Sequence, residues 1–457
     1  MFWELSRHHD SSTAIVDENG RLINYLELAA RVDEAAAHLS AFGERKLGFL
    51  FAGNTLDSLV SYLACLRARH VPLLLPGDMA PELVAALQEN YQPDWVLGAR
   101  VEGAALAGTE WFIAYSNQTP SRALAPDLAL LLSTSGSTGS PKLVRLSYAN
   151  LQANAASIAQ YLELSSDDRA LTVLPAHYSY GLSVINSHLL TGASLVLRDV
   201  SVLTPAFAET IRSNEVTSLA GVPSVYQMLW RTGFQKQEFP SLRTLTQAGG
   251  RLDEKLTAAF SQLAHDRGWR FFVMYGQTEA TARISYVPPG RLPEKIGSIG
   301  IPIPGGQLQI DPDNSELIYS GPNVMLGYAT CQDDLARGDD QLGVLRTGDV
   351  ARQDNEGFFY ITGRLKRFVK LAGNRIGLDE VEQQLEHKLS VPCMAAGRDE
   401  RMVVWLEGTD DALINQTKQW LASQFGIHHS LCRFRLVESL PMLSSGKKDY
   451  SALLADT

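Results

Sequence analysis

The first third of the chain alternates between short apolar runs and segments whose apolar residues recur at helical spacing. The helical pattern is clearest at 25–39, where apolar side chains at every third or fourth position would share one face. Segments at 56–68 and 83–90 predict two more helices. Strands that alternate with helices are typical of an α/β domain with a largely parallel sheet. The apolar runs that predict buried strands are at 13–16, 47–51, 70–75 and 95–97.

A segment rich in hydroxylated residues and glycine follows the next predicted strand, whose apolar residues are at 128–132. It reads LLSTSGSTGSPK at 131–142 and ends in Pro141 and Lys142. Glycine allows the backbone to approach an anion closely, amide and hydroxyl groups donate hydrogen bonds to it, and the lysine adds positive charge. Because a flexible linker rarely follows a buried strand directly and ends in Pro-Lys, the pattern indicates a polyphosphate-binding loop. It is not the P-loop of kinases and GTPases, in which lysine directly follows glycine.

This loop resembles the phosphate loop of the AMP-forming adenylate ligases, the superfamily of acyl-CoA synthetases, peptide-synthetase adenylation domains and firefly luciferase. Later segments resemble further parts of the same pattern, and each occurs once and in the family's order across residues 13–447. The order and spacing of the set make chance a poor explanation. The segments are FFVMYGQTE at 271–279, LRTGDVAR at 345–352, FFYITGRLKRFVK at 358–370 and LPMLSSGK at 440–447.

The resemblance implies an α/β fold with two domains. A large N-terminal domain at 1–363, built of several subdomains with parallel-rich sheets, would bind ATP and the acyl group. A hinge at 364–367, with Lys366 as its rotating residue, would join it to a small, mobile α+β domain at 368–457 that carries the catalytic lysine. Within this C-terminal domain the sequence predicts a hairpin at 369–376, helices at 379–388 and 413–425, and strands at 402–406 and 432–437.

Composition and charge narrow the class of protein further. A chain of 457 residues with 45% hydrophobic residues predicts two to four folding units. Its net charge of −10 argues against a nucleic-acid partner. We expect no membrane span and no signal peptide, because no apolar run reaches about 18 residues and the N-terminus lacks a basic, then apolar, pattern. The four cysteines are scattered, which fits the reducing cytoplasm and excludes a cysteine-built zinc site.

The resemblance assigns the ATP contacts to several of these segments. Tyr275 would stack on adenine, Asp349 would accept hydrogen bonds from the ribose hydroxyls, and Arg364 would contact ribose or phosphate. Lys142 would face the departing β- and γ-phosphates. The remaining residues implied to bind ATP or AMP are Thr134, Ser135, Gly136, Ser137, Thr138, Gly139, Gly249, Gly250, Arg251 and Gly276.

The implied reaction has two steps. Attack of a carboxylate on the α-phosphate of ATP gives an acyl-AMP and pyrophosphate. Thr278, Mg²⁺ held by Glu279, and the catalytic Lys447 would stabilise the charge that gathers on the α-phosphate. Rotation about Lys366 would then replace Lys447 by the loop around Gly373, where a pantetheine arm of coenzyme A or of an acyl carrier protein delivers the thiol.

The acid is not determined by the sequence, although its pocket is implied. Aromatic and small residues there fit an aryl acid or a modest acyl chain. Amino-acid-activating relatives place an aspartate at the position of Gly181 to hold the α-ammonium group, and glycine offers no counter-charge. This argues against an ordinary α-amino acid. The residues implied to line the acyl pocket are Tyr178, Tyr180, Gly181, Val222 and Ala248.

Three alternatives stay open. The chain could be a stand-alone amino-acid-activating domain that loads a carrier protein, with a β-amino acid or an unusual anchor for the ammonium group. It could perform luciferase-like oxygen chemistry on the acyl-AMP. It could also be a non-catalytic nucleotide-binding relative, which would be expected to lose Lys447 or Glu279, whereas this chain keeps both.

Overall fold

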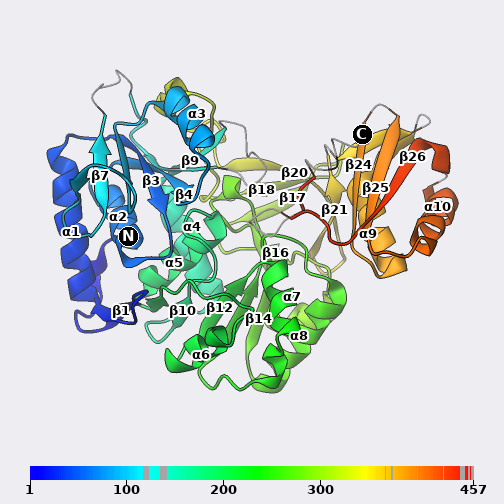
Figure 1. Cartoon of the computed structure of the whole chain (residues 1–457), viewed down its shortest axis with the longest axis horizontal. Helices are drawn as coiled ribbons and strands as arrows, with labels where there is room; N and C mark the ends of the chain where they lie inside the picture. The colour runs from blue at the N-terminus through cyan, green and yellow to red at the C-terminus, as the bar shows by residue number, and fades with distance from the viewer. Residues whose placement is uncertain are drawn as a thin grey trace. The chain divides into compact units, whose positions relative to one another are not determined.

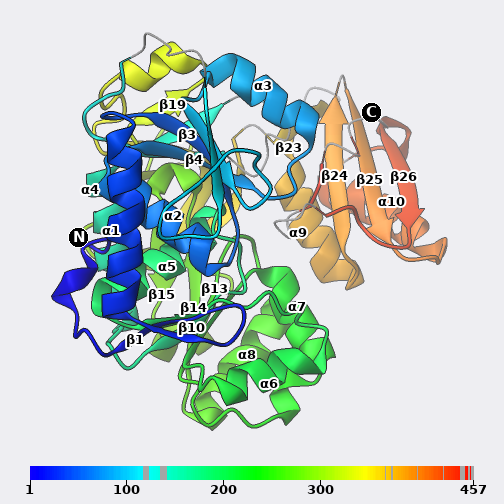
Figure 2. The same cartoon turned by 60° about the vertical axis from the view of Figure 1, so that its left-hand side comes forward.

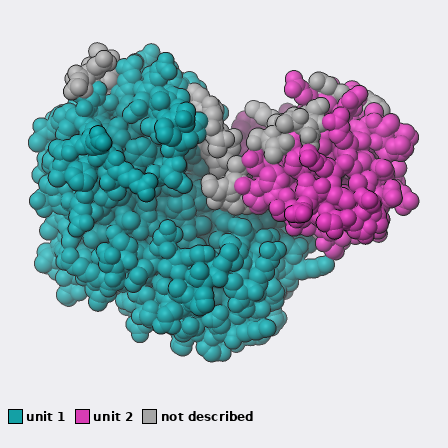
Figure 3. All heavy atoms as spheres, viewed as in Figure 1, with its two compact units in different colours: residues 1–307, 319–345 teal, residues 308–318, 346–457 magenta. Residues whose placement is uncertain are grey.

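The computed structural model describes residues 1–116, 123–133, 142–365, 367–371, 374–398, 400–425, 427–442, 448–450 and 453, with only the backbone of residues 374 and 375. The chain divides into two compact units, coloured separately in Figure 3. The first unit contains residues 1–307 and 319–345, and the second contains residues 308–318 and 346–457. No helix in these described ranges is both long and apolar enough to cross a membrane.

The first unit is built around two large sheets. In the described residues one has nine strands, in the order β16-β15-β14-β13-β12-β10-β11-β1-β2, and its central strands run parallel. Because parallel strands expose their carboxyl ends at one edge, the segments after β12, β13 and β14 come together there. The strands are β1 (Thr13–Val16), β2 (Leu22–Asn24), β10 (Arg169–Leu171), β11 (Ser194–Val196), β12 (Ser218–Gly221), β13 (Thr244–Gln247), β14 (Arg270–Tyr275), β15 (Ser285–Val287) and β16 (Ile301–Pro302).

The second sheet carries the two sides of the predicted phosphate loop. Its order is β19-β9-β8-β4-β3-β5-β7-β6, and β8 pairs antiparallel with β9. The predicted strands at 47–51, 70–75, 95–97 and 128–132 are confirmed within it. The strands are β3 (Leu47–Ala52), β4 (Val71–Pro76), β5 (Trp95–Gly98), β6 (Ala104–Ala105), β7 (Phe112–Tyr115), β8 (Leu128–Ser133), β9 (Leu143–Ser147) and β19 (Gly327–Ala329).

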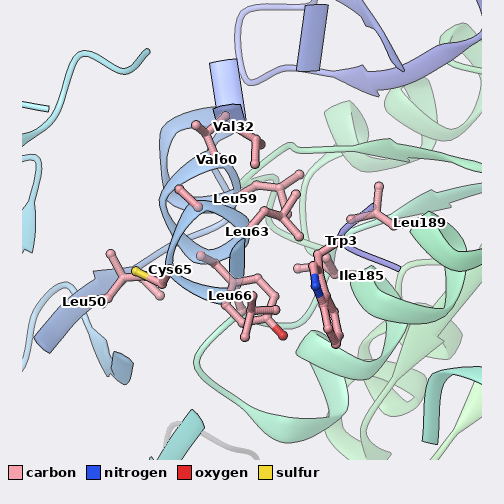
Figure 4. Close-up of a cluster of buried hydrophobic side chains, with 14 of the residues drawn as sticks. Trp3, Val32, Leu50, Leu59, Val60, Leu63, Cys65, Leu66, Ile185 and Leu189 are labelled. Carbon is pink, nitrogen blue, oxygen red and sulfur yellow. The ribbon is translucent and has the colours of Figure 1, made fainter. Parts of the chain in front are cut away.

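Helices separate and flank these sheets. In Figures 1 and 2, α4 and α5 lie between the two sheets, while α6, α7 and α8 lie together beside the nine-stranded sheet. One core forms where α1, α2 and α5 meet, with Val32, Leu63 and Ile185 in the same buried cluster (Figure 4). The helices are α1 (Tyr25–Ala41), α2 (Leu56–Arg67), α3 (Pro81–Tyr91), α4 (Tyr148–Leu162), α5 (Ser179–Thr191), α6 (Pro205–Ser213), α7 (Pro223–Arg231) and α8 (Glu254–Arg267).

One local prediction from the sequence is wrong. The sequence LTVLPAHYSYGL at 171–182 predicts a strand that runs into an aromatic-rich turn, but β10 ends at Leu171 and α5 already begins at Ser179. Tyr180 and Gly181 are therefore helical residues. Their helix is buried along most of its length and includes buried polar residues such as Ser183 and Asn186, so the exposed polar face typical of a surface helix is missing.

The second unit contains the elements predicted for the C-terminal domain. A four-stranded sheet, β17-β18-β20-β21, lies mostly in it, and β24 and β26 flank β25 in a three-stranded sheet. The predicted hairpin is β22 and β23, and α9 and α10 are the predicted helices. The bounds are β17 (Gln307–Ile310), β18 (Glu316–Ser320), β20 (Val344–Gln353), β21 (Phe359–Arg364), β22 (Phe368–Leu371), β23 (Asn374–Gly377), α9 (Leu378–Leu389), β24 (Cys393–Arg398), β25 (Arg401–Glu407), α10 (Ala412–Phe425) and β26 (Cys432–Val437).

Short 3₁₀ helices complete the described structure. One of them, η3, follows β14 and carries the two residues predicted to act on the α-phosphate and the metal. The six are η1 (Leu5–Arg7), η2 (Phe234–Lys236), η3 (Thr278–Ala280), η4 (Pro289–Glu294), η5 (Gln332–Ala336) and η6 (His429–Leu431).

Candidate active site

The predicted phosphate loop connects two strands that are paired with each other. Ser133, the last residue of β8, lies opposite Leu143, the first residue of β9, so the backbone on the two sides of the loop is held together. Lys142 immediately precedes β9 and is half-buried. The loop residues Thr134, Ser135, Gly136, Ser137, Thr138 and Gly139 lie outside the described residues.

Tyr328 brings Lys142 together with Glu279. The Nζ atom of Lys142 lies 3.4 Å from the centroid of the Tyr328 ring, and the Tyr328 hydroxyl donates a 2.8 Å hydrogen bond to Oε1 of Glu279. Burial and the nearby Glu279 carboxylate raise the pKa of Tyr328, so this hydroxyl keeps its proton and acts as a donor. A cation, a phenol and a carboxylate thus meet beside the predicted phosphate loop.

The same turn places Thr278 next to α5. The Oγ1 atom of Thr278 lies 3.2 Å from Oγ of Ser179, the first residue of α5. The main chain of the turn is held from the other side, because the Met325 amide donates to the Glu279 carbonyl at 2.8 Å. The Asn323 side chain donates to the carbonyls of Ala280 and Arg283, each at 2.8 Å. Thr278 and Glu279 therefore stand on a fixed turn at the carboxyl end of β14.

Tyr328 was missed by the sequence reasoning, as was Arg145, which holds its segment in place. Arg145 is fully buried in β9 and donates to the carbonyl oxygens of Leu326 and Tyr328 and to the carboxylate of Asp340. Tyr328 also pairs with Val144 across the β9–β19 ladder. An arginine inside the apolar strand LVRLS is the one signal that could have drawn attention to this brace, since a buried charge requires partners.

The three glycines predicted to bind ATP or AMP, Gly249, Gly250 and Gly276, lie in closely packed backbone. A Cβ atom on Gly276 would lie 1.7 Å from the carbonyl oxygen of Ala282, which no side chain can accept. Gly249 has φ of +82°, a conformation that favours glycine, and the Gly250 carbonyl accepts a 2.8 Å hydrogen bond from the buried Gln247. Tyr275 ends β14, where its hydroxyl accepts a 3.0 Å hydrogen bond from Gln277.

Arg251 stands apart from this group. It forms a 2.5 Å ion pair with Glu254 in the first turn of α8, and both side chains are about half exposed. An exposed pair of this kind contributes little to stability. The contact of Arg251 with the nucleotide stays a prediction.

Three of the predicted acyl-pocket residues are neighbours. The Tyr178 hydroxyl and the Val222 side chain both approach Gly249, within 2.6 and 3.0 Å of where its Cβ atom would lie. Ala248 precedes this glycine and is buried. Tyr180 lies deeper: it is 2% exposed, and its hydroxyl donates to the Thr246 carbonyl at 2.8 Å. Tyr180 thus supports the wall that Tyr178 borders, and the contact of these residues with an acyl group stays a prediction.

Packing requires a glycine at position 181, and this weakens the inference from the sequence that the substrate is not an α-amino acid. A Cβ atom there would lie 2.3 Å from the Pro175 carbonyl oxygen and 2.7 Å from that of Leu174. An aspartate at this position would force the backbone apart, so the glycine is required whatever the substrate is. Its presence therefore does not argue against an amino acid.

In the second unit, the two predicted ribose contacts are paired with each other. Asp349 and Arg364 lie opposite each other in the β20–β21 ladder, and Nε of Arg364 donates to Oδ1 of Asp349 at 3.1 Å. Asp349 is buried and Arg364 is exposed. Glu316 fixes the preceding turn, since it accepts hydrogen bonds from the Gly348 amide and from Arg346. Lys366, Gly373 and Lys447 lie outside the described residues.

The structure thus combines an α/β fold with a cluster of charged and polar side chains next to the strands that flank the predicted phosphate loop, and comparisons with known proteins give the family. A family model described as AMP-binding enzyme matches residues 2–329, so the chain belongs to the AMP-binding enzyme family. The family and the α/β fold class expected from the sequence are confirmed.

Individual relatives agree with this assignment. A feruloyl-CoA synthase from an Amycolatopsis species is 31% identical over 422 residues, which cover 84% of this chain and 82% of the relative. An L-proline–[L-prolyl-carrier protein] ligase from Pseudomonas fluorescens is 28% identical and covers 99% of this chain and 97% of its own length. The solved structure of O-succinylbenzoate coenzyme A synthetase from Bacillus subtilis, in complex with ATP and magnesium ion, shares the fold with a TM-score of 0.79 and 23% identity, covering 99% of this chain and 98% of that one.

Proposed function

We propose that this protein is an AMP-forming acid–thiol ligase that converts a carboxylic acid and ATP into an acyl-AMP and pyrophosphate, and then passes the acyl group to a pantetheine thiol. The observation that carries the proposal is the meeting of Lys142, Tyr328 and Glu279 beside Thr278, between the predicted phosphate loop and the end of β14. Family membership supports it, as do relatives named as coenzyme A and carrier-protein ligases.

In the first step, a carboxylate oxygen of the acid attacks the α-phosphorus of ATP. A P–O bond forms, the bond to the bridging oxygen breaks, and pyrophosphate leaves with the electron pair. Thr278 would donate to the α-phosphate, Lys142 would face the departing phosphates, and Lys447 would approach the α-phosphate from its own domain. Their task is positioning and charge stabilisation.

The residues present fit a magnesium ion. Glu279 is half-buried, Tyr328 occupies one of its two carboxylate oxygens, and carboxylate oxygen is a preferred ligand of this hard cation. Glu279 would hold the ion, which supplies positive charge against the phosphates when it is bound.

In the second step, the thiol sulfur attacks the acyl carbon, the thiol proton leaves to solvent, and AMP departs with the former carboxylate oxygen. We propose that rotation at 364–367 about Lys366 separates the two steps, with Gly373 beside the pantetheine arm. Coenzyme A and an acyl carrier protein present the same arm, and relatives of both kinds occur. We also propose a cytoplasmic location, because all four cysteines are free thiols.

Two observations support the alternative in which the protein activates an amino acid. Gly181 is explained by packing, and the L-proline–[L-prolyl-carrier protein] ligase matches nearly the whole chain. In this second candidate function, the protein loads an amino acid onto a carrier protein.

Acid-dependent ATP–pyrophosphate exchange over fatty, aryl, dicarboxylic and amino acids tests the proposal. We expect exchange with at least one non-amino acid, followed by thioester formation when coenzyme A or a pantetheine-bearing carrier protein is added. Exchange with amino acids alone would establish the second candidate. Absence of exchange with every acid, from protein that binds ATP in a calorimeter, would overturn both.

The hydroxyl of Tyr328 is expected to tune the metal site. Tyr328→Phe keeps the ring beneath Lys142 but removes the hydrogen bond to Glu279, so we expect the Mg²⁺ concentration for half-maximal exchange to rise about 10-fold. Tyr25→Phe removes the hydroxyl of a more deeply buried tyrosine, which donates to the Ala193 carbonyl, and it serves as the control. An unchanged Mg²⁺ requirement in Tyr328→Phe would show that the hydrogen bond from Tyr328 to Glu279 does not contribute to metal binding.

A further inference from the structure

Arg283 is a buried cation for which the proposed reaction has no use. It follows the turn that carries Thr278 and Glu279, and it is 2% exposed. Its guanidinium lies over the ring of Tyr180, with Cζ 3.9 Å from the centroid, and its buried Nε has no hydrogen-bond partner. Within the part of the chain that the structure describes, no carboxylate forms an ion pair with it. A buried charge normally has a counter-charge, so this arginine requires an explanation.

The groups around the guanidinium are phenols, and they cannot supply the missing charge. Burial raises the pKa of Tyr180, and it raises that of Tyr161 to about 12 although Arg283 acts in the opposite direction. Burial also raises the pKa of Tyr178. These three hydroxyls therefore stay neutral at physiological pH. The ring of Tyr180 offers a cation–π contact, which returns only part of the cost of removing a guanidinium from water.

The backbone turns this side chain inward at some cost. Thr281, two residues earlier, has φ of +65°, which is unfavourable for a β-branched residue, and its hydroxyl is tied to the Asn323 carbonyl at 2.7 Å. The Arg283 carbonyl is held by the Asn323 side chain, and its Cα lies 3.0 Å from where a Cβ on Gly276 would stand. A strained turn that directs a charge into the interior is typical of a functional site.

Two tyrosines connect Arg283 to the predicted acyl pocket. Tyr180 carries the guanidinium on its ring and meets Tyr178 edge-on, at 6.3 Å between ring centroids. Tyr178 in turn borders Gly249 and Val222. Tyr180 and Tyr178 thus connect the charge to the residues at which an acyl group is expected to end.

We propose that Arg283 is the counter-ion for a second carboxylate on the acid, so that this ligase activates one carboxyl group of a dicarboxylic acid while Arg283 binds the other. This inference rests on the proposed function and adds the class of its substrate. A carboxylate matches the guanidinium in charge and can accept two parallel hydrogen bonds from it. The same pairing would orient the acid, since the distance between its carboxyl groups fixes which one reaches ATP.

The test compares acids that differ only in the second carboxylate. Adipic acid is paired with hexanoic acid, and terephthalic acid with 4-methylbenzoic acid, because in each pair a methyl group replaces the carboxyl group. In ATP–pyrophosphate exchange, the wild-type protein should favour the diacid of at least one pair by roughly 100-fold in kcat/KM. Arg283→Met should reverse this preference, and Arg283→Lys, which keeps the charge, should retain part of it.

The control and the contrary outcomes separate this inference from its rival, a purely structural arginine. Arg270→Met removes an arginine that is paired with Glu163, and the diacid preference should not change. Wild-type preference for the monoacids, or equal loss for both members of a pair in Arg283→Lys and Arg283→Met, would overturn the inference. If Arg283→Met does not fold, the ratio of kcat/KM for diacid and monoacid, measured in the wild type and in Arg283→Lys, still tests the inference. Exchange with monoacids alone leaves the proposed function standing, whereas silence with every acid of the wider panel, from protein that binds ATP, overturns both.

Discussion

Replacing Lys447 with alanine is expected to lower acid-dependent ATP–pyrophosphate exchange about 100- to 1,000-fold, because it would remove the positive donor proposed to stabilise the transition state at the α-phosphate. Transfer of a synthetic acyl-AMP to the thiol should stay within a few-fold of wild type, since Lys447 is expected to have left the site by then. The two half-reactions are measured separately, by exchange and by thioester formation from the acyl-AMP. A split between them is the signature of a residue that serves only the first step.

The neighbouring lysine provides a matched control. The Nζ atom of Lys448 donates hydrogen bonds to Glu386 at 2.7 Å, to Glu382 at 3.1 Å and to the Cys393 carbonyl at 2.6 Å. Lys448→Ala should therefore lower stability and affect both half-reactions alike. Equal losses in the two half-reactions of Lys447→Ala would contradict the assignment of Lys447 to adenylation.

Much of the architecture could be predicted because short segments of the sequence determine its helices and strands. The strand before the phosphate loop, the helix at 25–39 and the order of elements in the C-terminal domain follow from apolar spacing and turn residues. The wrong segment, 171–182, failed for a related reason. Since α5 is buried on most sides, it has no exposed polar face, and its first residues lie within the aromatic run that predicts a turn.

The site was predictable only where chemistry lies within one short segment. Thr278 and Glu279 adjoin a strand end, and Asp349 follows a turn glycine, so the family resemblance could assign phosphate, metal and ribose contacts to them, and these contacts stay predictions. The partners of these residues were not predictable. Tyr328 is 49 positions from Glu279, and Arg145 is 195 positions from Asp340. Contacts over such separations depend on strand order, which a single sequence does not reveal.

Gly181 illustrates a different limit. Its residue type was interpreted through the substrate, whereas the structure explains it through the carbonyl groups of Leu174 and Pro175. A glycine can indicate that there is no space for a side chain, but only the structure reveals whether a ligand or the protein backbone occupies that space. Arg283 shows another limit, because the sequence identifies it as an arginine but does not indicate that it is buried.

Within the second unit, Glu382 is expected to be the side chain on which folding depends most. It is 4% exposed, and its carboxylate accepts hydrogen bonds from four donors. Arg367 and the Ala395 amide bind Oε1, each at 2.7 Å, whereas Lys448 and the Tyr450 hydroxyl bind Oε2 at 3.1 and 2.9 Å. One carboxylate thus joins the residue after the proposed hinge lysine to the residue after the proposed catalytic lysine.

Glu382→Gln should destabilise this unit by about 3 kcal/mol, because it leaves Arg367 and Lys448 buried with less opposing charge. The effect is measured by hydrogen–deuterium exchange of β24 and β25, whose amides should exchange about 100-fold faster if they open with the whole unit. Glu380→Gln changes an exposed carboxylate on the same helix and should leave exchange unchanged. Equal protection in both variants would mean that Asp379 and Glu386 alone balance the two cations. Loss of protection should also slow adenylation more than ATP binding, because Lys447, the proposed catalytic residue, directly precedes Lys448.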